Sequence, residues 1–558
     1  MAKYNIYSFD IFDTLLLRSY TDPQEVWRVL EEREGAKGFA KARKKGDVQS
    51  YKVSTEEGRE TSIEEAYNLM PKTFRPMMQK EMKLEREVLR ANPEMLELWN
   101  ELGKEGKRRV IVSDMYLSAD FIKLLLEENG FTGWDGFYLS SERNARKTTG
   151  RLFEIMLEEE GVKPSEVLHI GDNEWSDVKV PQGMGIQVQH YKKISERLFD
   201  DFPFMRKISP RLAGVLALGW HQYKKDNPNL TYWNKLGFSM GGILGYLYVS
   251  WIVKVAKERG VSHLMFVARD GYIWKKMCNT LFPEMTTDYF YAPRLTSIAV
   301  LGAIGSDPIA IADRKRYMER HLKGVKPEDV KQQYTQYLEQ FTIDEHTALV
   351  DGCSSGFSAQ RLVETAVGHP VFSFYLLAMA KMHNAGALYQ ARHSLPFQDL
   401  SEFLFGSPEK PIKDVTLKGP VYKTQLLEDE RFKISVSDEI SDGALVSAQI
   451  LHKEGTILAT DDWMNYQNLF WGNRTIEDVR ELSLARNATD VQQNEFRGIM
   501  RGAFPDKRIR FKIHGCEFIT SYYKYSEGDY LREYYLLKKF LLRRYRDKVY
   551  KSYVVAKY

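Results

Sequence analysis

The sequence predicts two consecutive α/β units, each built around a parallel sheet. The chain has 558 residues, which is more than one hydrophobic core usually serves. Short apolar runs alternate with helix-favouring segments over residues 1–195, and the same alternation resumes after residue 210. This alternation is typical of strands that are connected by helices in a doubly wound parallel sheet.

Five short apolar runs in residues 1–195 predict strands, at 4–9, 110–112, 137–139, 167–170 and 186–188. The stretch between the first two, residues 21–101, is charged and rich in helix-forming residues. We expect it to form a helical cap over the end of the first strand.

The second unit is expected to span residues 211–558. Residues 191–210 contain Pro203 and Pro210, and we place a linker at 196–210. Further strands are predicted at 263–268, 289–291, 347–351 and 371–376. The C-terminal part, 530–550, is expected to be helical, whereas residues 411–512 show no clear pattern.

Composition and charge exclude several classes of protein. The formal net charge is +4, so nothing in the overall balance indicates a nucleic-acid partner. The three cysteines show no CxxC spacing, which argues against a disulfide framework or a structural zinc site. Without a signal-peptide pattern at the start, we expect a cytoplasmic protein.

Two segments raise the question of membrane contact. The apolar run 236–253 contains six glycine or serine residues and predicts a buried core helix rather than a span. Residues 538–546 interleave basic and apolar side chains. They predict either peripheral contact with the inner face of the membrane or a solvated helix face, and both interpretations stay open.

Polar residues follow the predicted strands of the first unit in an ordered set. Asp10 comes directly after the first strand, Ser113 after the second, and Asp172 after a later one, with Asp177 five residues on. Lys147 stands before a predicted helix. The carboxyl ends of parallel strands meet at one edge of a sheet, so we expect these groups to converge there.

Phosphoryl transfer explains why these residue types occur together. A carboxylate such as Asp10 can attack phosphorus, and a divalent cation held by acidic oxygens offsets the repulsion between the carboxylate and a phosphate. Ser113 can donate a hydrogen bond to a phosphoryl oxygen, and Lys147 can neutralise charge on the transferred group. A loop carboxylate that caps a helix would explain any one of these residues alone.

With all four motifs present in order, residues 1–195 resemble the haloacid dehalogenase superfamily of phosphatases. The resemblance implies a Rossmann-like domain in which Asp10 is the nucleophile and Asp10, Asp172 and the Phe12 carbonyl hold Mg²⁺, supported by Asp177. Phe12 stands where these phosphatases carry a second, acidic aspartate. Either Asp13 takes over the role of that acid, or the catalytic step is impaired.

A second set of candidate residues lies in the expected second unit. Asp351 ends an apolar strand and precedes a loop of small residues before a helix, an arrangement that binds phosphate through backbone N–H groups. The loop residues are Ser354, Ser355, Gly356, Phe357 and Ser358. Arg269 and Arg294 are candidate anion contacts, and Asp270 is a candidate base. A structural Arg269–Asp270 pair is the alternative.

These features resemble a divergent phosphoribosyltransferase over residues 210–410. The resemblance implies that Asp351 and the loop 354–358 bind phosphoribosyl pyrophosphate (PRPP), although Gly352 replaces the usual second acid. A phosphatase fused to such a transferase is similar to the bifunctional enzymes that form ribofuranose in bacterial surface polysaccharides such as O-antigen or capsule. The implied partners are PRPP and a glycan or lipid-linked sugar acceptor.

Two alternative functions stay open on the sequence alone. The first is a stand-alone sugar-phosphate or nucleotide phosphatase whose second half only binds a partner or glycan. The second is a scaffold that binds a phosphorylated ligand without catalysis, in which Phe12 marks a retired site.

Overall fold

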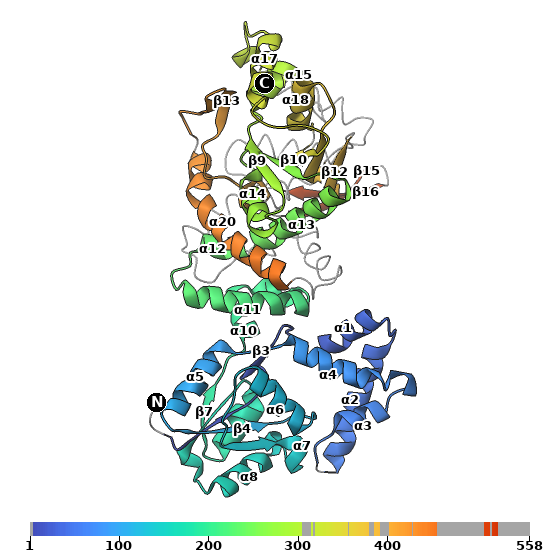
Figure 1. Ribbon diagram of the computed structural model, residues 1–558, viewed down its shortest axis with the longest axis vertical. Helices are drawn as coiled ribbons and strands as arrows, with labels where there is room; N and C mark the ends of the chain where they lie inside the picture. The colour runs from blue at the N-terminus through green and yellow to red at the C-terminus, as the bar shows by residue number, and fades with distance from the viewer. Residues whose placement is uncertain are drawn as a thin grey trace. The chain divides into compact units, whose positions relative to one another are not determined.

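The computed structural model describes residues 4–57, 59–303, 314–315, 318–354, 356–378, 384–390, 401–426, 428–454, 507–513 and 516–522. These residues belong to two compact units (Figure 1). Unit 1 comprises residues 4–200 and 205–222, and unit 2 comprises 201–204, 223–454 and the hairpin within 507–522. Each unit contains its own five-stranded sheet.

The sheet of unit 1 is entirely parallel and has the strand order β5-β4-β1-β6-β7. Its strands are β1 (Ile6–Phe9), β4 (Arg108–Ser113), β5 (Gly136–Leu139), β6 (Val167–Gly171) and β7 (Gln187–His190). Each of the five predicted strands overlaps one of them. The chain order reverses between β1 and β6, and in open α/β sheets ligands bind at the carboxyl ends of the strands at such a point.

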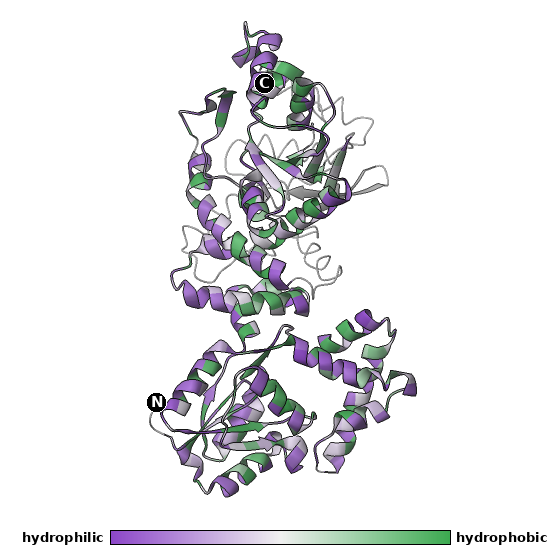
Figure 2. Cartoon of the chain, in the orientation of Figure 1, coloured by the Kyte–Doolittle hydropathy of each residue, from purple (hydrophilic) through white to green (hydrophobic). Residues whose placement is uncertain are grey.

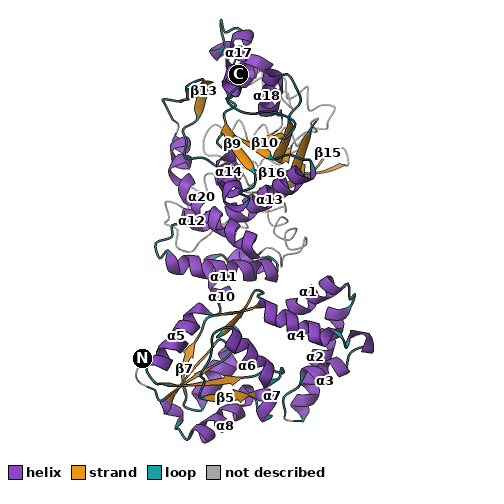
Figure 3. Ribbon diagram, in the orientation of Figure 1, coloured by secondary structure: helices purple, strands orange, loops and turns teal. Residues whose placement is uncertain are grey.

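Alternate residues of the unit 1 strands point to opposite faces of the sheet and bury two separate cores. Tyr7 and Phe9 pack with side chains of α5 (Pro93–Lys104) and α6 (Ala119–Glu128). Ile6 and Val110 pack with α8 (Arg151–Glu160) on the other face. The short helices α7 (Ser140–Arg143) and α9 (Val180–Gly183) complete the layers, so the strands lie between helices (Figure 3).

The helical cap of unit 1 is shorter than the sequence predicts. It consists of α1 (Glu25–Glu34), α2 (Phe39–Glu56), α3 (Ile63–Asn68) and α4 (Met77–Val88), and an antiparallel ribbon of β2 (Leu16–Arg18) and β3 (Leu89–Ala91) leads to and from it. Residues 93–101, expected in the cap, instead belong to α5. Asn92 caps that helix and Trp99 packs against Phe9 at a ring distance of 5.3 Å, which holds α5 on the sheet.

The segment expected as a linker at 196–210 is helical. It contains α10 (Ile194–Asp201), a 3₁₀ turn (Pro203–Lys207) and the start of α11 (Pro210–Asp226). Both prolines stand at the first position of their helical segments, where proline is tolerated because that N–H has no helical partner. Ile194 and Leu198 are buried, and the Thr21 N–H donates to the Pro210 carbonyl at 3.0 Å. These residues are therefore packed parts of the fold.

The sheet of unit 2 is also parallel, with the order β12-β11-β10-β8-β9. Its strands are β8 (His263–Val267), β9 (Thr286–Phe290), β10 (Thr347–Ser354), β11 (Phe372–Ala378) and β12 (Ala385–Gln390). The sequence predicts the first four and misses β12. The chain order reverses between β8 and β10, which places the ends of these two strands at the expected ligand-binding point.

The described helices of unit 2 include α12 (Tyr232–Leu236), α13 (Gly242–Glu258), α14 (Gly271–Leu281), α15 (Arg294–Leu301), α17 (Pro327–Leu338), α18 (Ser358–Val367) and α20 (Glu428–Glu454). Two antiparallel hairpins follow the sheet, β13 (Ile412–Thr416) with β14 (Gly419–Tyr422), and β15 (Lys507–Ile513) with β16 (Cys516–Tyr522). The predicted helix at 530–550, with its basic residues 538–546, lies outside the described residues.

One stretch of unit 2, Tyr232–Glu258, is long and apolar enough to cross a membrane by length and composition. Its α13 part is strongly hydrophobic (Figure 2). However, 78% of the most apolar window is buried inside the structure. The glycines of this stretch allow α20 to approach closely: a Cβ atom on Gly237 would lie 2.0 Å from the Ile440 carbonyl oxygen. The burial favours the predicted core helix.

Helices α10 and α11 are attached to unit 1 through Glu94 at the start of α5. Its carboxylate accepts a hydrogen bond from Arg197 at 3.0 Å and lies 3.3 Å from His221. The adjacent His221 ring and the charge of Arg197, opposed by partial burial, lower the pKa of Glu94 from 4.5 to about 2. A carboxylate with a lowered pKa stabilises the fold above its unfolded pKa and loses that contribution as the pH falls through its folded pKa.

We therefore expect Glu94→Gln to reduce the free energy of unfolding of unit 1 by about 1–2 kcal/mol at neutral pH, after discounting for partial exposure. The difference from wild type should shrink between pH 4.5 and 2, because the wild-type carboxylate becomes protonated there. Urea denaturation at several pH values measures this difference. A deficit that is equally large at pH 2 and pH 7 would show that charge is not its cause.

Candidate active site

Asp10 lies immediately after β1 and is buried at the carboxyl end of the sheet. Its Oδ1 atom accepts hydrogen bonds from the Ser113 hydroxyl at 2.9 Å and from the Lys147 ammonium at 2.6 Å. Burial raises the pKa of Asp10, as does the charge of Asp177, while Lys147 opposes both effects. The structure thus brings Asp10 together with two residues that lie more than a hundred positions away in the sequence.

Lys147 is buried between two carboxylates. Its ammonium donates to Asp10 and to Asp177, and its backbone N–H donates to Asp114 at 2.7 Å. Burial alone would lower the pKa of Lys147, but the two neighbouring aspartates raise it well above its usual value. The lysine therefore stays charged and supplies the fixed positive charge that a phosphoryl group requires.

Asp177 is held by a chain of buried polar groups. Its Oδ1 atom lies 3.2 Å from His169 Nε2, and His169 Nδ1 lies 2.7 Å from the Ser8 hydroxyl. Burial would raise the pKa of Asp177, but the charge of Lys147 and the His169 hydrogen bond hold it well below its usual range. His169 and Ser8 had no predicted role, although their positions on adjacent buried strands mark them as partners.

Asp172 completes a group of carboxylates that could hold a metal ion. One oxygen each of Asp10, Asp172 and Asp177 lies within 4.8 Å of the other two. All three donors are hard oxygen atoms, the type that Mg²⁺ prefers. Burial and the charge of Asp10 raise the pKa of Asp172 to about 7, as expected for carboxylates that lie close together. The residues therefore fit the predicted Mg²⁺.

The turn after Asp10 contains Phe12 and Asp13. The Asp13 N–H donates to the Leu16 carbonyl at 2.8 Å, and Asp13 adopts a left-handed conformation with φ of 56°, which asparagine and aspartate tolerate better than most residues. The Phe12 ring lies 4.5 Å below the Arg18 guanidinium. Phe12 thus brings no acid to the site, whereas its carbonyl belongs to the turn beside Asp10.

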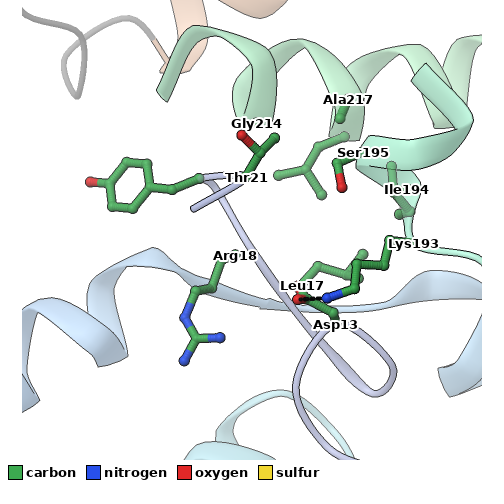
Figure 4. A pocket seen from close by; sticks show the side chains of 11 residues that line it. Asp13, Leu17, Arg18, Thr21, Lys193, Ile194, Ser195, Gly214 and Ala217 are labelled. Carbon is green, nitrogen blue, oxygen red and sulfur yellow. Dashed lines mark hydrogen bonds and ion pairs between the residues drawn. The ribbon is translucent and has the colours of Figure 1, made fainter. Parts of the chain in front are cut away.

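Lys193 is a further residue of the site that the sequence does not reveal. Its ammonium lies 3.0 Å from Asp13 Oδ2 and 2.9 Å from Asp172 Oδ2, and Figure 4 shows its contact with Asp13. Lys193 lies between β7 and α10, just before the segment 196–210 that was predicted to be a linker. The rule that places residues after parallel strands at one sheet edge, applied to this fifth strand, could have identified it.

In unit 2, Asp351 lies within β10 and Asp270 follows β8, the two strands between which the chain order reverses. Asp351 Oδ1 accepts the Gly352 N–H at 2.8 Å, and the Tyr248 hydroxyl donates to the Asp351 carbonyl at 2.8 Å. A Cβ atom on Gly352 would lie 2.8 Å from Asp270 Oδ2. Position 352 is therefore glycine because the Asp270 carboxylate occupies the space of its side chain.

Burial raises the pKa values of both aspartates, to about 7 for Asp270 and about 6 for Asp351. The nearby charge of Glu402 raises both further, and Asp351 raises that of Asp270. Glu402 therefore adds negative charge close to both aspartates. It belongs to no sequence motif, so it was not among the predicted site residues.

The predicted phosphate loop joins β10 to α18. Ser354 is the last residue of β10, and its hydroxyl accepts the Phe357 N–H at 2.8 Å. Phe357 has φ of 52° and caps α18, which begins at Ser358. Gly356 lies in the bend before it, while Ser355 lies outside the described residues. The loop therefore ends at a helix N-terminus, as predicted.

The two predicted arginines lie on neighbouring segments of the same edge. Arg269 follows β8 with φ of 77°, and its N–H donates to the Tyr289 hydroxyl at 2.7 Å. Arg294 is exposed at the start of α15, after β9. Its charge, together with burial, lowers the pKa of Arg314, so two guanidinium groups lie near each other in this part of unit 2.

Known proteins match the N-terminal part of the chain. The family model of the haloacid dehalogenase-like hydrolases matches residues 4–185, whereas no curated protein matches. Among solved structures, an L-2-haloacid dehalogenase from Xanthobacter autotrophicus is 19% identical, covers 36% of this chain and 82% of its own, and has a TM-score of 0.28.

A haloacid dehalogenase family enzyme from Bacteroides thetaiotaomicron, solved with magnesium and inorganic phosphate, is likewise 19% identical. It covers 34% of this chain and 95% of its own, with a TM-score of 0.27. Together with the sheet order and the convergence of Asp10, Lys147 and Asp172, the family match identifies residues 4–185 as a haloacid dehalogenase-like hydrolase domain.

Proposed function

We propose that the chain is a bifunctional enzyme that transfers phosphoribosyl from PRPP to a sugar acceptor and then removes the 5-phosphate. The observation that carries the phosphatase half is the contact of Asp10 with both Ser113 and Lys147 beside a group of carboxylates. This arrangement combines a nucleophile, a hydrogen-bond donor and a fixed charge, the three elements of phosphoryl transfer through a carboxylate.

In the phosphatase step, the Asp10 carboxylate attacks phosphorus, and the bond between phosphorus and the sugar oxygen breaks. We propose that Asp13 first donates a proton to the leaving oxygen. Later it accepts the proton released by the water that hydrolyses the aspartyl-phosphate. Lys147 stabilises the charge on the phosphoryl oxygens. Mg²⁺, bound by Asp10, Asp172 and Asp177, would offset the repulsion between the carboxylates and the phosphate dianion.

The transferase half rests on the place of Asp270 in unit 2. Phosphoribosyltransferases usually carry two neighbouring acids before the phosphate loop, and here Gly352 replaces the second. The Asp270 carboxylate comes from the adjacent strand end and occupies the space beside Asp351. We therefore propose that Asp351 accepts hydrogen bonds from the ribose hydroxyls and that Asp270, with a pKa near neutrality, is the base for the acceptor hydroxyl.

Anion contacts at the same sheet edge support a phosphorylated donor. The helices α14, α15 and α18 all begin just after strands β8, β9 and β10, and helix N-termini favour anions. We assign the 5-phosphate to residues 354–358 and pyrophosphate to Arg269 and Arg294. During transfer, the bond between C1 and the pyrophosphate oxygen breaks, the acceptor oxygen bonds to C1, and its proton passes to Asp270.

The order of the two reactions gives the fusion a chemical purpose. Transfer leaves a phosphomonoester on the glycan, and that group is a substrate for the Asp10 site. Tethering both sites in one chain raises the effective concentration of the intermediate at the second site. We propose a glycan or lipid-linked sugar of a bacterial surface polysaccharide as the acceptor, processed in the cytoplasm at the inner face of the membrane.

Removing the metal ligand Asp172 tests the proposed cation. We expect Asp172→Asn to weaken Mg²⁺ binding about tenfold or more, because the site loses one charged ligand. Calorimetric titration of Mg²⁺ into the full chain measures this effect. Asp200→Asn is the matched control, since Asp200 is partly exposed and pairs with Lys192. Equal Mg²⁺ affinity in wild type and Asp172→Asn would contradict the assignment.

Removing the nucleophile tests the phosphatase. With Mg²⁺ and a generic phosphomonoester, we expect wild type to release phosphate and Asp10→Asn to show a loss of about 10³-fold or more, because an amide cannot form the phosphorylated intermediate. Phosphate release by the exposed control Asp120→Asn should equal that of wild type. Activity that persists in Asp10→Asn would exclude Asp10 as the nucleophile.

Titration of Mg²⁺–PRPP tests the transferase without a known acceptor. In the Asp10→Asn background, where the phosphatase is silent, we expect saturable binding that Asp351→Asn abolishes. Asp442→Asn, an exposed position on α20 that pairs with Lys276, should bind PRPP normally. Absence of binding, or binding that survives the loss of Asp351, would refute the transferase and favour a stand-alone phosphatase.

A further inference from the structure

The charges of the phosphatase site form two parallel sets. Lys147 lies between Asp10 and Asp177, and Lys193 lies between Asp13 and Asp172. With all four carboxylates ionised, these groups carry a net charge of −2. One divalent cation neutralises this charge, so a phosphate dianion can then approach. Without Lys193 the same site would keep one uncompensated negative charge.

The position of Lys193 differs from that of a mobile surface lysine. Its side chain is 40% exposed, but its partners Asp13 and Asp172 are only 27% and 7% exposed. A contact with a buried carboxylate is screened less than one between surface groups. The adjacent Lys192 pairs instead with Asp200, where both side chains are at least 40% exposed.

The surrounding fold fixes where Lys193 lies. Ile194 and Leu198 anchor α10 in the interior, and Arg197 binds Glu94. Lys193 and Asp13 line one small pocket with Leu17 and with Gly214 of α11 (Figure 4). Gly214 allows that helix to approach closely, because a Cβ atom there would lie 2.4 Å from the Ser19 carbonyl oxygen. The packing of α10 and α11 therefore fixes the position of Lys193.

The carboxylates that Lys193 contacts, Asp13 and Asp172, are also held in place. Asp13 is held by the turn that closes on Leu16 and has a left-handed backbone. The Thr14 hydroxyl lies 3.4 Å from Asp172 Oδ1, while Lys193 binds Asp172 Oδ2. Each oxygen of Asp172 therefore has a polar neighbour, and the carboxylate is oriented before any ligand arrives.

We propose that Lys193 is a positioning residue of the phosphatase site that orients Asp13 and Asp172 and provides the second positive charge needed for phosphate binding. The inference rests on the proposed phosphatase function. It assigns to Lys193 a direct contribution to phosphate binding, whereas the carboxylates, and not Lys193, hold Mg²⁺. A lysine that only fills the place of the cation would leave phosphate binding unchanged once Mg²⁺ is bound.

Three variants of the full chain test the proposal. Lys193→Met removes the charge and keeps the length, Lys193→Arg keeps the charge, and Lys192→Met is the matched control. Calorimetry with Mg²⁺ alone, then with inorganic phosphate at saturating Mg²⁺, measures the two affinities separately. Thermal unfolding shows that each variant is folded, and Lys193→Gln replaces Lys193→Met if methionine prevents folding.

We expect Lys193→Met to bind Mg²⁺ at least as tightly as wild type, because a competing cation is gone. Phosphate affinity should fall about tenfold or more, since a charged contact and the charge balance are lost. Lys193→Arg should recover most of the affinity, and Lys192→Met should match wild type. With a phosphomonoester substrate, the same variant should raise KM more than it lowers kcat.

Unchanged phosphate affinity in Lys193→Met at saturating Mg²⁺ would overturn the proposal, as would an equal loss in Lys192→Met. These binding measurements need no turnover. If wild type binds phosphate through Lys193 but releases none from phosphomonoesters, the proposed phosphatase fails while the role of Lys193 stands.

Discussion

The buried ammonium of Lys147 is the interaction on which the catalytic site depends. It joins Asp10, which follows β1, to Asp177, which follows β6. Its own backbone N–H is held by Asp114. Two buried carboxylates at this distance would repel each other strongly, and removing one partner of a buried ion pair is costly. The lysine therefore opposes the rise in the pKa of Asp10 and keeps Asp177 ionised inside the fold.

Both units place their candidate sites by the same topological rule. In unit 1 the strand order reverses between β1 and β6, which end just before Asp10 and Asp172. In unit 2 it reverses between β8, which is followed by Asp270, and β10, which contains Asp351. At such a reversal the connecting helices leave on opposite faces, and the strand ends stay open to ligands. The two sites thus arise from the sheet order and not from any similarity between the units.

The sequence predicts most of this arrangement because the signals are local. Apolar runs mark the strands, and Asp10, Ser113 and Asp172 each follow one directly, so their convergence follows from parallel pairing. What the sequence does not show depends on long-range packing. The prolines at 203 and 210 indicate a linker by composition, but burial of Ile194 and Leu198 makes the segment helical, and this packing delivers Lys193.

The same limit applies to unit 2 and to the cap. Gly352 indicates a missing acid when read along the chain, whereas the Asp270 carboxylate fills its place from another strand. By composition the helical cap domain continues to residue 101, yet Asn92 is the N-cap residue of a new helix whose Trp99 packs on Phe9. In both cases a contact between distant residues decides the outcome, and no local pattern encodes it.

The central claim is that Asp10 carries the phosphoryl group during hydrolysis. The most direct test is a single-turnover reaction of the wild-type chain with Mg²⁺ and a phosphomonoester, quenched in acid and analysed by mass spectrometry of its peptides. We expect a transient phosphate on the peptide that contains Asp10, appearing before free phosphate. Release of free phosphate without any phosphorylated Asp10 peptide, under conditions that preserve an acyl phosphate, would contradict it.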